Sequence, residues 1–309
     1  MKALSSCFGF RSQRRKSEQE SDLEVLVEKA PFHSNRRPKS FRVLVTGQGA
    51  FPKNPDRPED GRYLESDNTS HLITARLPSH LPAFSMYNPT PVAIKILNPT
   101  AAPGAAIRTE YSFARKYIRD LWTRYGNEVD LILHLGMADG WEWYALEHSA
   151  WKEGTIKKID TGFGYSDERE YYLMRDDTGK TIKDLGPCPW NEDVPKQLFT
   201  LEGLDINNLA QSTQKALNKH GHGKEIEVRA HPDPGDYLCG FVAYESLAQA
   251  FTNGYTAKTL YCHVPGWLDE KSLENGKKFV CNLVSQIAAR SVANEADDLN
   301  PRNPFKRPH

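Results

Sequence analysis

The feature that most constrains the fold is an alternation, along residues 41–290, of short β-branched apolar runs with longer segments of helical periodicity. Short apolar runs bounded by turn residues are typical of buried strands. Strands that alternate with helices in one chain indicate an α/β domain built in layers. We predict strands at 41–46, 92–97, 130–135 and 259–264, and a weaker one at 225–230.

Four segments have the apolar spacing of amphipathic helices. In the first, from Ile107 to Tyr125, apolar residues recur at steps of three and four, and Gly126 supplies a stop. The others are expected at 205–219, closed by Gly221 or Gly223, from about 236–239 to 251, and at 273–287, with Asp269 as N-cap. The third helix therefore begins close to Cys239.

Composition narrows the class of protein further. No apolar run approaches the roughly 18 residues of a membrane-spanning helix, and 40 Lys and Arg balance 40 Asp and Glu. We therefore expect no membrane segment and no nucleic-acid partner. With 309 residues, the chain is long enough for a sizeable core.

The five cysteines are an odd number without regular spacing. This usage argues against a disulfide-stapled secreted domain and predicts a reducing compartment, the cytosol. The first ten residues also lack the apolar core of a signal peptide. There is no CxxC pair, and Cys262 beside His263 is the one close Cys/His doublet, so no metal site is predicted.

The ends of the chain differ from its middle. Residues 1–40 carry a basic run broken by acidic residues and hold few apolar positions, so we expect a disordered basic arm there rather than a site for RNA or acidic lipid. Residues 291–309 end in a proline-rich stretch and are expected to be a disordered tail. Within the domain at 41–290, the acidic stretch near 166–196 is expected to be a surface excursion.

Cys239 and His263 are the candidates for chemistry. An ordinary thiol is only about 3% ionised at pH 7, so a nucleophilic cysteine needs help. The N–H groups at a helix start favour a negative sulfur, and a histidine that ends the next parallel strand lies at the same edge of the sheet. On spacing alone, however, the simpler interpretation is that Cys239 is a buried apolar residue and His263 a structural one.

Four motifs favour the catalytic interpretation of Cys239 and His263 over the structural one. They are LVTGQGAF at 44–51, followed by Asn54-Pro55, LHLGMADGWEWYALE at 133–147, PGDYLCGFVAYESL at 234–247 and CHVP at 262–265. Together and in this order they resemble pyroglutamyl peptidase type I, a family of cysteine peptidases that remove N-terminal pyroglutamate. The family pattern has a TGFGPFG-like loop, an HxG strand end followed by a glutamate, a GxYLCN-like nucleophile turn and a FxHVP strand.

The resemblance implies a three-layer α/β/α sandwich with a mixed, mostly parallel sheet, in agreement with the alternation of strands and helices. It also implies that Cys239 is the nucleophile, His263 the general base and later acid, and Glu147 the carboxylate that orients the imidazole. No metal or cofactor is implied. Judged by its residue type alone, Glu147 would be an exposed glutamate on a helix.

Other residues compete for the roles of the histidine and the carboxylate. The rivals are His148, His231, Asp139, Asp233 and Asp236. Nothing beyond nearness in sequence favours either rival histidine. Among the three aspartates, Asp236 is expected instead to cap the helix of Cys239.

The substrate loop departs from the family pattern. Pyroglutamate is a small neutral lactam, so its pocket is expected to be apolar with one or two polar groups. Phe51 keeps one aromatic position, but Gln48 stands where phenylalanine is expected and Ala50 where proline is expected. We expect Gln48 and Phe51 to bind the substrate, with Gln48 bonding to the lactam or to a more polar N-terminal group. Gly240 also replaces a polar residue after the nucleophile.

The sequence therefore predicts a cysteine-type omega-peptidase that acts on peptides with a blocked N-terminus through a Cys-His-Glu triad and a thioester. One alternative is a related thiol amidase or peptidase with another N-terminal preference. A second is a non-catalytic binding protein that keeps the fold. The oligomeric state is left open by the sequence.

Overall fold

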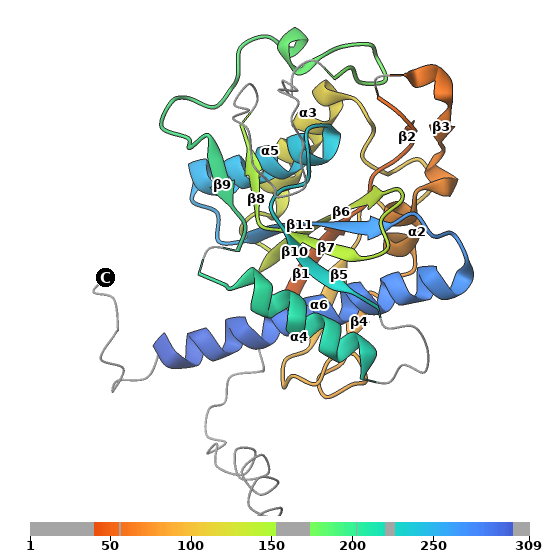
Figure 1. Ribbon diagram of the computed structural model, residues 1–309. Helices are drawn as coiled ribbons and strands as arrows, with labels where there is room; N and C mark the ends of the chain where they lie inside the picture. Colours follow the sequence, from red (N-terminus) through yellow and green to blue (C-terminus); the bar gives the residue numbers. More distant parts are fainter. Residues whose placement is uncertain (1–39, 56, 153–173, 202, 220–225, 299–309) are drawn as a thin grey trace, which may run out of the picture. The chain divides into compact units, whose positions relative to one another are not determined.

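The computed structural model describes residues 40–55, 57–152, 174–201, 203–219 and 226–298. A seven-stranded sheet forms the centre of the domain (Figure 1). From one edge to the other, its strands are β10 (Val228–His231), β7 (Tyr144–Glu147), β11 (Lys258–Pro265), β6 (Leu131–Ala138), β1 (Phe41–Thr46), β5 (Ile94–Leu97) and β4 (His80–Leu81).

The sheet is mixed but mostly parallel. Strands β11, β6, β1 and β5 pair in parallel, and so do β10 and β7. Two pairs are antiparallel, namely β7 with β11 and the edge strand β4 with β5. Strand β7 is therefore antiparallel to β11 on one side and parallel to β10 on the other.

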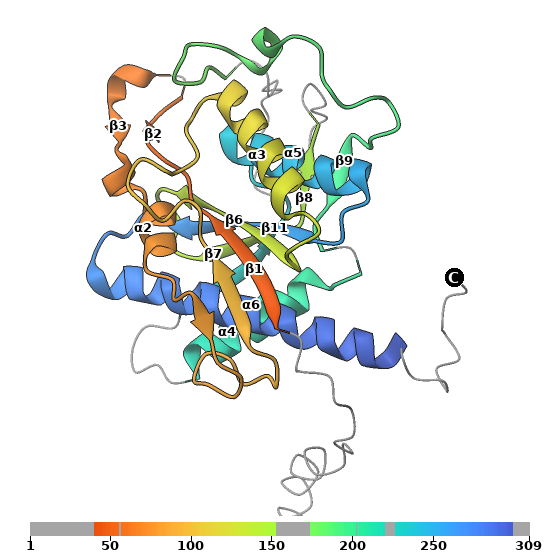
Figure 2. The ribbon, with the colours of Figure 1, turned by 180° about the vertical axis from the view of Figure 1, so that it is seen from behind.

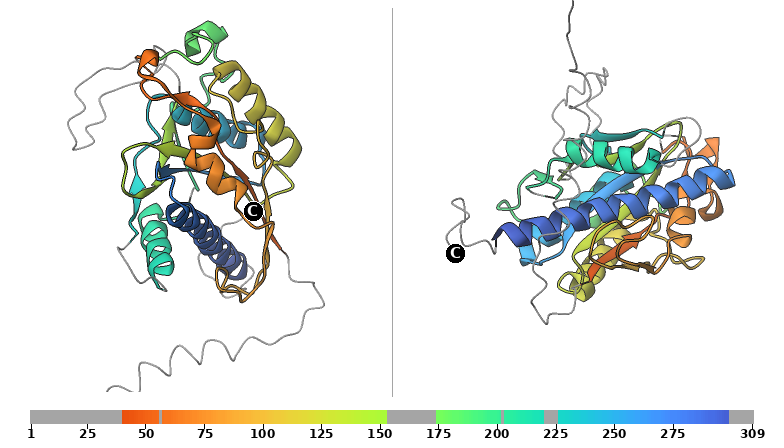
Figure 3. Two further views of the ribbon diagram at one scale, coloured as in Figure 1. Left: turned by 90° about the vertical axis from the view of Figure 1, so that its right-hand side faces the viewer. Right: turned by 90° about the horizontal axis from the view of Figure 1, so that it is seen from below.

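Helices cover both faces of the sheet (Figures 2 and 3). One face carries α3 (Tyr111–Tyr125) and α5 (Leu238–Asn253), and the other carries α4 (Ile206–Asn218) and α6 (Glu270–Asp298), with the short α2 (Thr69–Ala75) beside α6. The left view of Figure 3 shows the sheet between these helices. The predicted three-layer α/β/α sandwich is confirmed.

Two apolar cores join the layers, because each strand presents alternate residues to opposite faces. In β11, Leu260 and Val264 pack toward α6, whereas Tyr261 packs toward α3 and α5. On the α6 side, the ring of Tyr144 stacks on that of Phe279, with centroids 4.5 Å apart. Because full burial of one such side chain contributes about 1.5–3 kcal/mol, a register slip that reversed the faces would be costly.

Smaller elements surround the sheet. The described residues form the strand pairs β2 (Phe51–Pro52) with β3 (Arg62–Tyr63) and β8 (Ser149–Trp151) with β9 (Gln197–Phe199), and the 3₁₀-helices η1 (Pro58–Asp60), η2 (Glu65–Asp67) and η4 (Ile182–Leu185). Among the helices of the described residues, none has both the length and the apolar character needed to cross a membrane.

Several predicted helix ends agree with the structure. Helix α3 begins at Tyr111 rather than at Ile107, but Gly126 is its C-cap residue, as predicted. The carboxylate of Asp269 accepts the N–H of Ser272 at 3.0 Å, which confirms the predicted cap of α6. The predicted glycine stops of α4, at 221 and 223, lie outside the described residues.

Helix α6 is longer than predicted. It continues to Asp298, so residues 291–298 are helical where a disordered tail is expected. The sequence of this segment contains no glycine or proline before Pro301, so nothing in it forces the helix to end at 290. Residues 299–309, and the predicted arm up to residue 39, lie outside the described part of the chain.

The described part of the acidic stretch 166–196 begins at residue 174, and most of its residues are exposed or half-buried. Two of its acidic side chains bind it to the rest of the domain. Asp176 is buried, and its carboxylate accepts the N–H of Tyr111 at 2.9 Å. It thereby satisfies one of the first N–H groups of α3, which lack helical partners. Asp177 forms an ion pair with Arg62, with 2.6 Å between the nearest atoms. These two acidic side chains hold the segment in place.

Candidate active site

Glu147 and His263 meet on one face of the sheet because of the pairing between β7 and β11. His263 is paired with Ala145 in this antiparallel register, and Glu147 lies two residues further along β7, on the same face. Oε1 of Glu147 lies 2.7 Å from Nδ1 of His263. Glu147 is thus a buried strand residue, and the expectation of an exposed helical glutamate from its residue type is wrong.

Cys239 is the second residue of α5, on the same side of the sheet. The first N–H groups of a helix lack helical partners and carry partial positive charge, which favours an anion at this position. The helix begins where the sequence predicts. Its N-cap residue is Tyr237, whose side chain makes no cap hydrogen bond, so the expectation that Asp236 caps this helix is wrong.

The imidazole of His263 is in contact with both Cys239 and Glu147. Burial by itself lowers the pKa of His263. The negative charge of a Cys239 thiolate and its hydrogen bond to the ring, together with the Glu147 carboxylate, outweigh burial and raise the pKa to about 10. The protonated imidazolium is therefore the favoured state of the His263 ring.

The second oxygen of Glu147 contacts another histidine. Oε2 lies 2.8 Å from Nδ1 of His231, which ends β10 and is aligned with Glu147 in the parallel pairing of β10 with β7. Burial raises the pKa of Glu147, but the bonds to the two histidines outweigh burial and lower the pKa. The carboxylate stays charged although the residue is only 1% exposed.

Tyr261 adds a hydroxyl group beside Cys239. Its oxygen accepts a hydrogen bond from Nε2 of Gln48 at 2.7 Å and is in hydrogen-bonding contact with Cys239. The Cys239 thiol donates to Oε1 of Gln48, with 3.4 Å from Sγ to oxygen. These three side chains form a closed triangle of polar contacts around the sulfur. Tyr261 occupies the position where the FxHVP pattern has phenylalanine.

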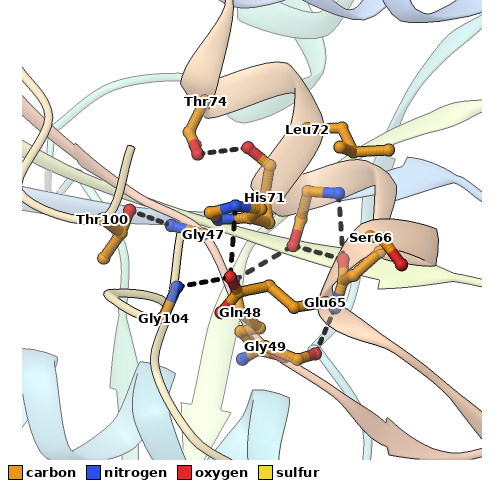
Figure 4. A network of polar contacts seen from close by, with 12 residues as sticks. Gly47, Gln48, Gly49, Glu65, Ser66, His71, Leu72, Thr74, Thr100 and Gly104 are labelled. Atoms are coloured by element: carbon orange, nitrogen blue, oxygen red, sulfur yellow. Dashed lines mark hydrogen bonds and ion pairs between the residues drawn. The ribbon is translucent and has the colours of Figure 1, made fainter. Parts of the chain in front are cut away.

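The loop that carries Gln48 is held by its backbone (Figure 4). The N–H of Gln48 donates to Oγ of Ser70 at 3.1 Å, and that of Gly47 donates to Oγ1 of Thr100 at 2.8 Å. A Cβ at Gly47 would lie 2.9 Å from backbone atoms of Ser70 and His71. Glycine is required here because the loop passes so close to α2.

Asn68 holds the far side of the same loop, and Glu65 joins two segments next to it. Oε1 of Glu65 accepts the N–H of Gly104 at 2.7 Å and lies 3.5 Å from Nε2 of His71 (Figure 4). The side-chain amide of Asn68 donates to the carbonyl of Gly49 at 2.7 Å. Gln48 is therefore presented by a loop that is anchored on both sides.

Phe51, the other predicted substrate-binding residue, lies in β2. Its ring packs on Tyr63, with 5.0 Å between the centroids, and the Tyr63 hydroxyl donates to the carboxylate of Asp139. Of the two predicted substrate-binding residues, Gln48 is the one with a described contact to Cys239. Asp139 is bound to Tyr63, so its described partner is not the His263 ring.

Two other rivals also have different partners. His148 is exposed, and its ring packs against Phe199 with 5.3 Å between the centroids. The carboxylate of Asp233 accepts the N–H of Gly235 at 2.9 Å. Glu147 is therefore the carboxylate that contacts His263.

His134, the histidine of the HxG motif, belongs to a buried polar network. Its Nδ1 lies 2.7 Å from Oγ1 of Thr46, and its Nε2 lies 2.9 Å from Oγ of Ser246. Burial lowers the pKa of His134 to about 3. This ring is therefore neutral near pH 7, and it links β6 to β1 and α5.

Two residues of the site, Tyr261 and Trp141, are not predicted from the sequence. Tyr261 lies two residues before His263 on the same strand, so its place on the same face was open to prediction from strand periodicity. The ring of Trp141 packs against His263 and His231, with centroids 5.4 and 4.9 Å apart. Trp141 follows β6 in a loop, where no periodicity indicates its direction.

The contacts define what the site can do chemically. A thiol, an imidazole and a carboxylate in sequence are the parts of a nucleophile, its general base and the group that orients the base. Such a set can take an acyl group onto sulfur and release it to water. Within the described residues, no group of three His, Cys, Asp or Glu side chains is placed to hold a metal ion.

No family model and no curated protein matches this sequence. Solved structures do resemble it. The pyrrolidone carboxyl peptidase from Thermococcus litoralis is 16% identical, with a TM-score of 0.53 over 87% of this chain and 100% of that chain. Pyroglutamyl peptidase I from Bacillus amyloliquefaciens is 17% identical, with a TM-score of 0.53 over 81% and 98%. The pyrrolidone carboxyl peptidase from Fervidobacterium islandicum is 20% identical, with a TM-score of 0.50 over 81% and 99%. These similarities show that the chain has the fold of these peptidases.

Proposed function

We propose that this chain is a cysteine peptidase of the pyroglutamyl peptidase type I family and removes pyroglutamate from the N-terminus of peptides. The observation that carries the proposal is the row formed by Cys239, His263 and Glu147, in which the imidazole contacts both the sulfur and the carboxylate. The four sequence motifs and the fold of the solved pyroglutamyl peptidases support it.

In the first half of the proposed reaction, the Cys239 thiolate attacks the carbonyl carbon of the pyroglutamyl residue and forms a C–S bond. The oxygen of that carbonyl becomes an oxyanion, which N–H groups at the start of α5 stabilise. His263 gives its Nε2 proton to the departing amine as the C–N bond breaks. A thioester on Cys239 and a free peptide amine result.

In the second half, the neutral His263 ring takes a proton from water while the water oxygen attacks the thioester. The C–S bond then breaks, pyroglutamate leaves, and the thiolate and imidazolium are restored. Glu147 holds the Nδ1–H of His263 throughout, which keeps Nε2 directed at the reacting atoms. These steps use neither a metal nor a cofactor.

One observation favours a second candidate, a related thiol amidase or peptidase with a different N-terminal preference. The Gln48 amide lies beside the nucleophile, at a position where the family loop has an aromatic ring. Its polar atoms favour a substrate residue that offers hydrogen-bonding groups. The chemistry on Cys239 would be the same for both candidates.

Fluorogenic amides test these proposals. We expect the pyroglutamyl amide to be cleaved faster than the alanyl and glutaminyl amides, and Cys239→Ala to remove nearly all turnover. Cys188→Ser, a control at another cysteine outside a disulfide, should keep the turnover of wild type. Faster cleavage of the glutaminyl amide would select the second candidate. A wild-type protein that cleaves none of the amides, and whose Cys239 resists iodoacetamide at pH 6, would refute both and favour a binding protein that keeps the fold.

We also propose a cytosolic location and blocked peptides as the partners of this site. A nucleophilic thiol must stay reduced, and none of the four cysteines in the described part of the chain is in a disulfide. Cell fractionation followed by the amide assay on each fraction checks the location. Activity confined to a secreted or membrane fraction would contradict it.

A further inference from the structure

We propose that His231 is a positioning residue for the Glu147 carboxylate, and that the charge on the His231 ring controls how readily His263 gives up its proton. This inference rests on the proposed function, because it concerns the same site. It assigns a role to a histidine that lies on the edge strand β10, outside the Cys-His-Glu row.

Glu147 is shared between two imidazoles. Its strand, β7, lies between β11 and β10, and each neighbour contributes one histidine on the same face. The Nδ1 atoms of His263 and His231 lie 2.7 and 2.8 Å from the two different carboxylate oxygens. A buried carboxylate needs donors for its oxygens to remain charged, and His231 supplies one of them.

The tautomer of His231 follows from a second contact. Its Nδ1 also lies 2.8 Å from the backbone carbonyl of Asp233, which can only accept a hydrogen bond. Nδ1 therefore carries a hydrogen in both the neutral and the charged ring, and Nε2 is the atom that gains or loses the proton. The bond to Glu147 is kept in either state, so titration changes the charge beside the carboxylate without removing its donor.

His231 is placed to exchange protons with solvent. Its side chain is 35% exposed, against 7% for His263 and 1% for Glu147. Burial lowers the pKa of His231, but the hydrogen bond and charge of Glu147 outweigh burial and raise the pKa above its usual value. The half-buried His231 ring is therefore the one of the two that can exchange protons with solvent directly.

The groups around His231 define its electrostatic surroundings. Glu147 faces it from β7 and His263 from β11, and the ring of Trp141 lies over it with 4.9 Å between the centroids. From the following turn, Asp233 faces it, and burial together with the charges of Glu147 and Asp236 raises the pKa of the Asp233 carboxyl. The charge on Glu147 thus dominates the surroundings of the ring.

The sign of the effect follows from these charges. When His231 is protonated, its positive charge lies across Glu147 from the positive charge of His263 and destabilises it. His263 then gives its proton more readily to a leaving amine, but its ion pair with the Cys239 thiolate is weaker. When His231 is neutral, Glu147 supports the His263 imidazolium without this competition. The three groups therefore titrate as a coupled set.

Two replacements of His231 separate its roles. In His231→Asn the amide nitrogen takes the place of Nδ1 and keeps a neutral donor, while His231→Leu removes the donor. We expect the Asn variant to stay within about threefold of wild type in kcat/KM at pH 8 but to lose one ionisation from the acid limb of the pH profile. We expect the Leu variant to lose about 10- to 100-fold in kcat/KM. His148→Asn, a control at an exposed histidine next to Glu147, should match wild type.

The inference is overturned if the Leu variant keeps wild-type kcat/KM, or if the Asn variant keeps the complete pH profile. NMR of protein labelled at its histidines gives a reading that does not depend on turnover. We expect the pKa values of both His231 and His263 to fall in Glu147→Gln; a fall for His263 alone would overturn the shared-carboxylate arrangement. A wild-type protein that cleaves no pyroglutamyl amide refutes the proposed function, and the NMR titration still decides the role of His231.

Discussion

The Tyr261 hydroxyl fills the space that a side chain at Gly136 would need: a Cβ built on Gly136 would lie 2.2 Å from the hydroxyl oxygen. The two residues are on neighbouring strands, and Gly136 is paired with His263, two residues beyond Tyr261 on the same face. The glycine of the HxG motif therefore makes room for the phenol that reaches Cys239.

Gly136→Ala should destabilise the protein and lower its activity, because the phenol must move away from Cys239. Overpacking of this kind costs about 1–3 kcal/mol, which lowers Tm by several degrees in a domain of this size. The double variant with Tyr261→Phe removes the closest contact and should regain part of the lost Tm but not the activity. Thermal unfolding and the amide assay on both variants check this. Equal Tm values for the single variant and wild type would contradict the proposed clash.

Tyr261→Phe should slow the reaction of Cys239 with iodoacetamide. The hydroxyl is in contact with the sulfur, and a hydrogen bond to a charged group contributes about 1.5–3 kcal/mol, so we expect roughly a tenfold lower alkylation rate at pH 6. Tyr244→Phe is the matched control, since its hydroxyl donates to the Pro195 carbonyl at 2.8 Å from the same helix as Cys239. An equal loss in both variants would mean that the effect is structural and not specific to Cys239.

Glu147→Gln should lower kcat/KM by about 100-fold, less than the loss of the nucleophile. The variant keeps the shape of the side chain but removes the charge that helps to raise the pKa of His263. In wild type, the stabilisation from this raised pKa is complete below the ordinary value near 6.5 and is lost as pH rises through about 10. In Glu147→Gln this stabilisation should be lost at a lower pH, as measured by the unfolding free energy as a function of pH. An unchanged upper pH limit of the stabilisation in Glu147→Gln would contradict this prediction.

His134 should make the protein less stable in acid. Because burial lowers its pKa to about 3, the unfolded chain binds a proton below about pH 6.5 that the folded chain does not. The unfolding free energy should therefore fall with decreasing pH by up to about 1.4 kcal/mol per unit from this group. His134→Gln should have a smaller slope between pH 6.5 and 4 in urea unfolding. In addition, the NMR signal of His134 should not titrate above pH 4; a midpoint near 6 would contradict the prediction.

The sequence predicts the elements that carry Cys239 and His263, because both have strong local signals. Strand β11 is an apolar run ended by proline, and α5 has an apolar face after a Pro-Gly turn. Local signals of this kind act within one element, so they survive without knowledge of its neighbours. Only the family motif predicts that Glu147 is a site residue, since its residue type indicates an exposed position.

Sequence patterns do not predict the contacts between different strands and helices. Strand β7 has four residues, all buried, and therefore shows no alternation that would reveal its two faces. The reach of Glu147 to His231 depends on the alignment of β10 with β7, which is set by tertiary pairing. The same holds for Gln48, which is brought to Tyr261 across 213 positions of the chain.

Because β7 is short and paired on both sides, a one-residue change in its register reverses the direction of all its side chains. Displacing it by one residue against β11 would turn the carboxylate into the α6 layer and present Leu146 to both imidazoles. Lesions far from the sulfur, such as loss of the Tyr144 ring from its stack on Phe279, would then mimic damage to the reacting groups in any turnover measurement. In this molecule, the distinction between a supporting residue and a chemical one depends on the alignment of four amino acids.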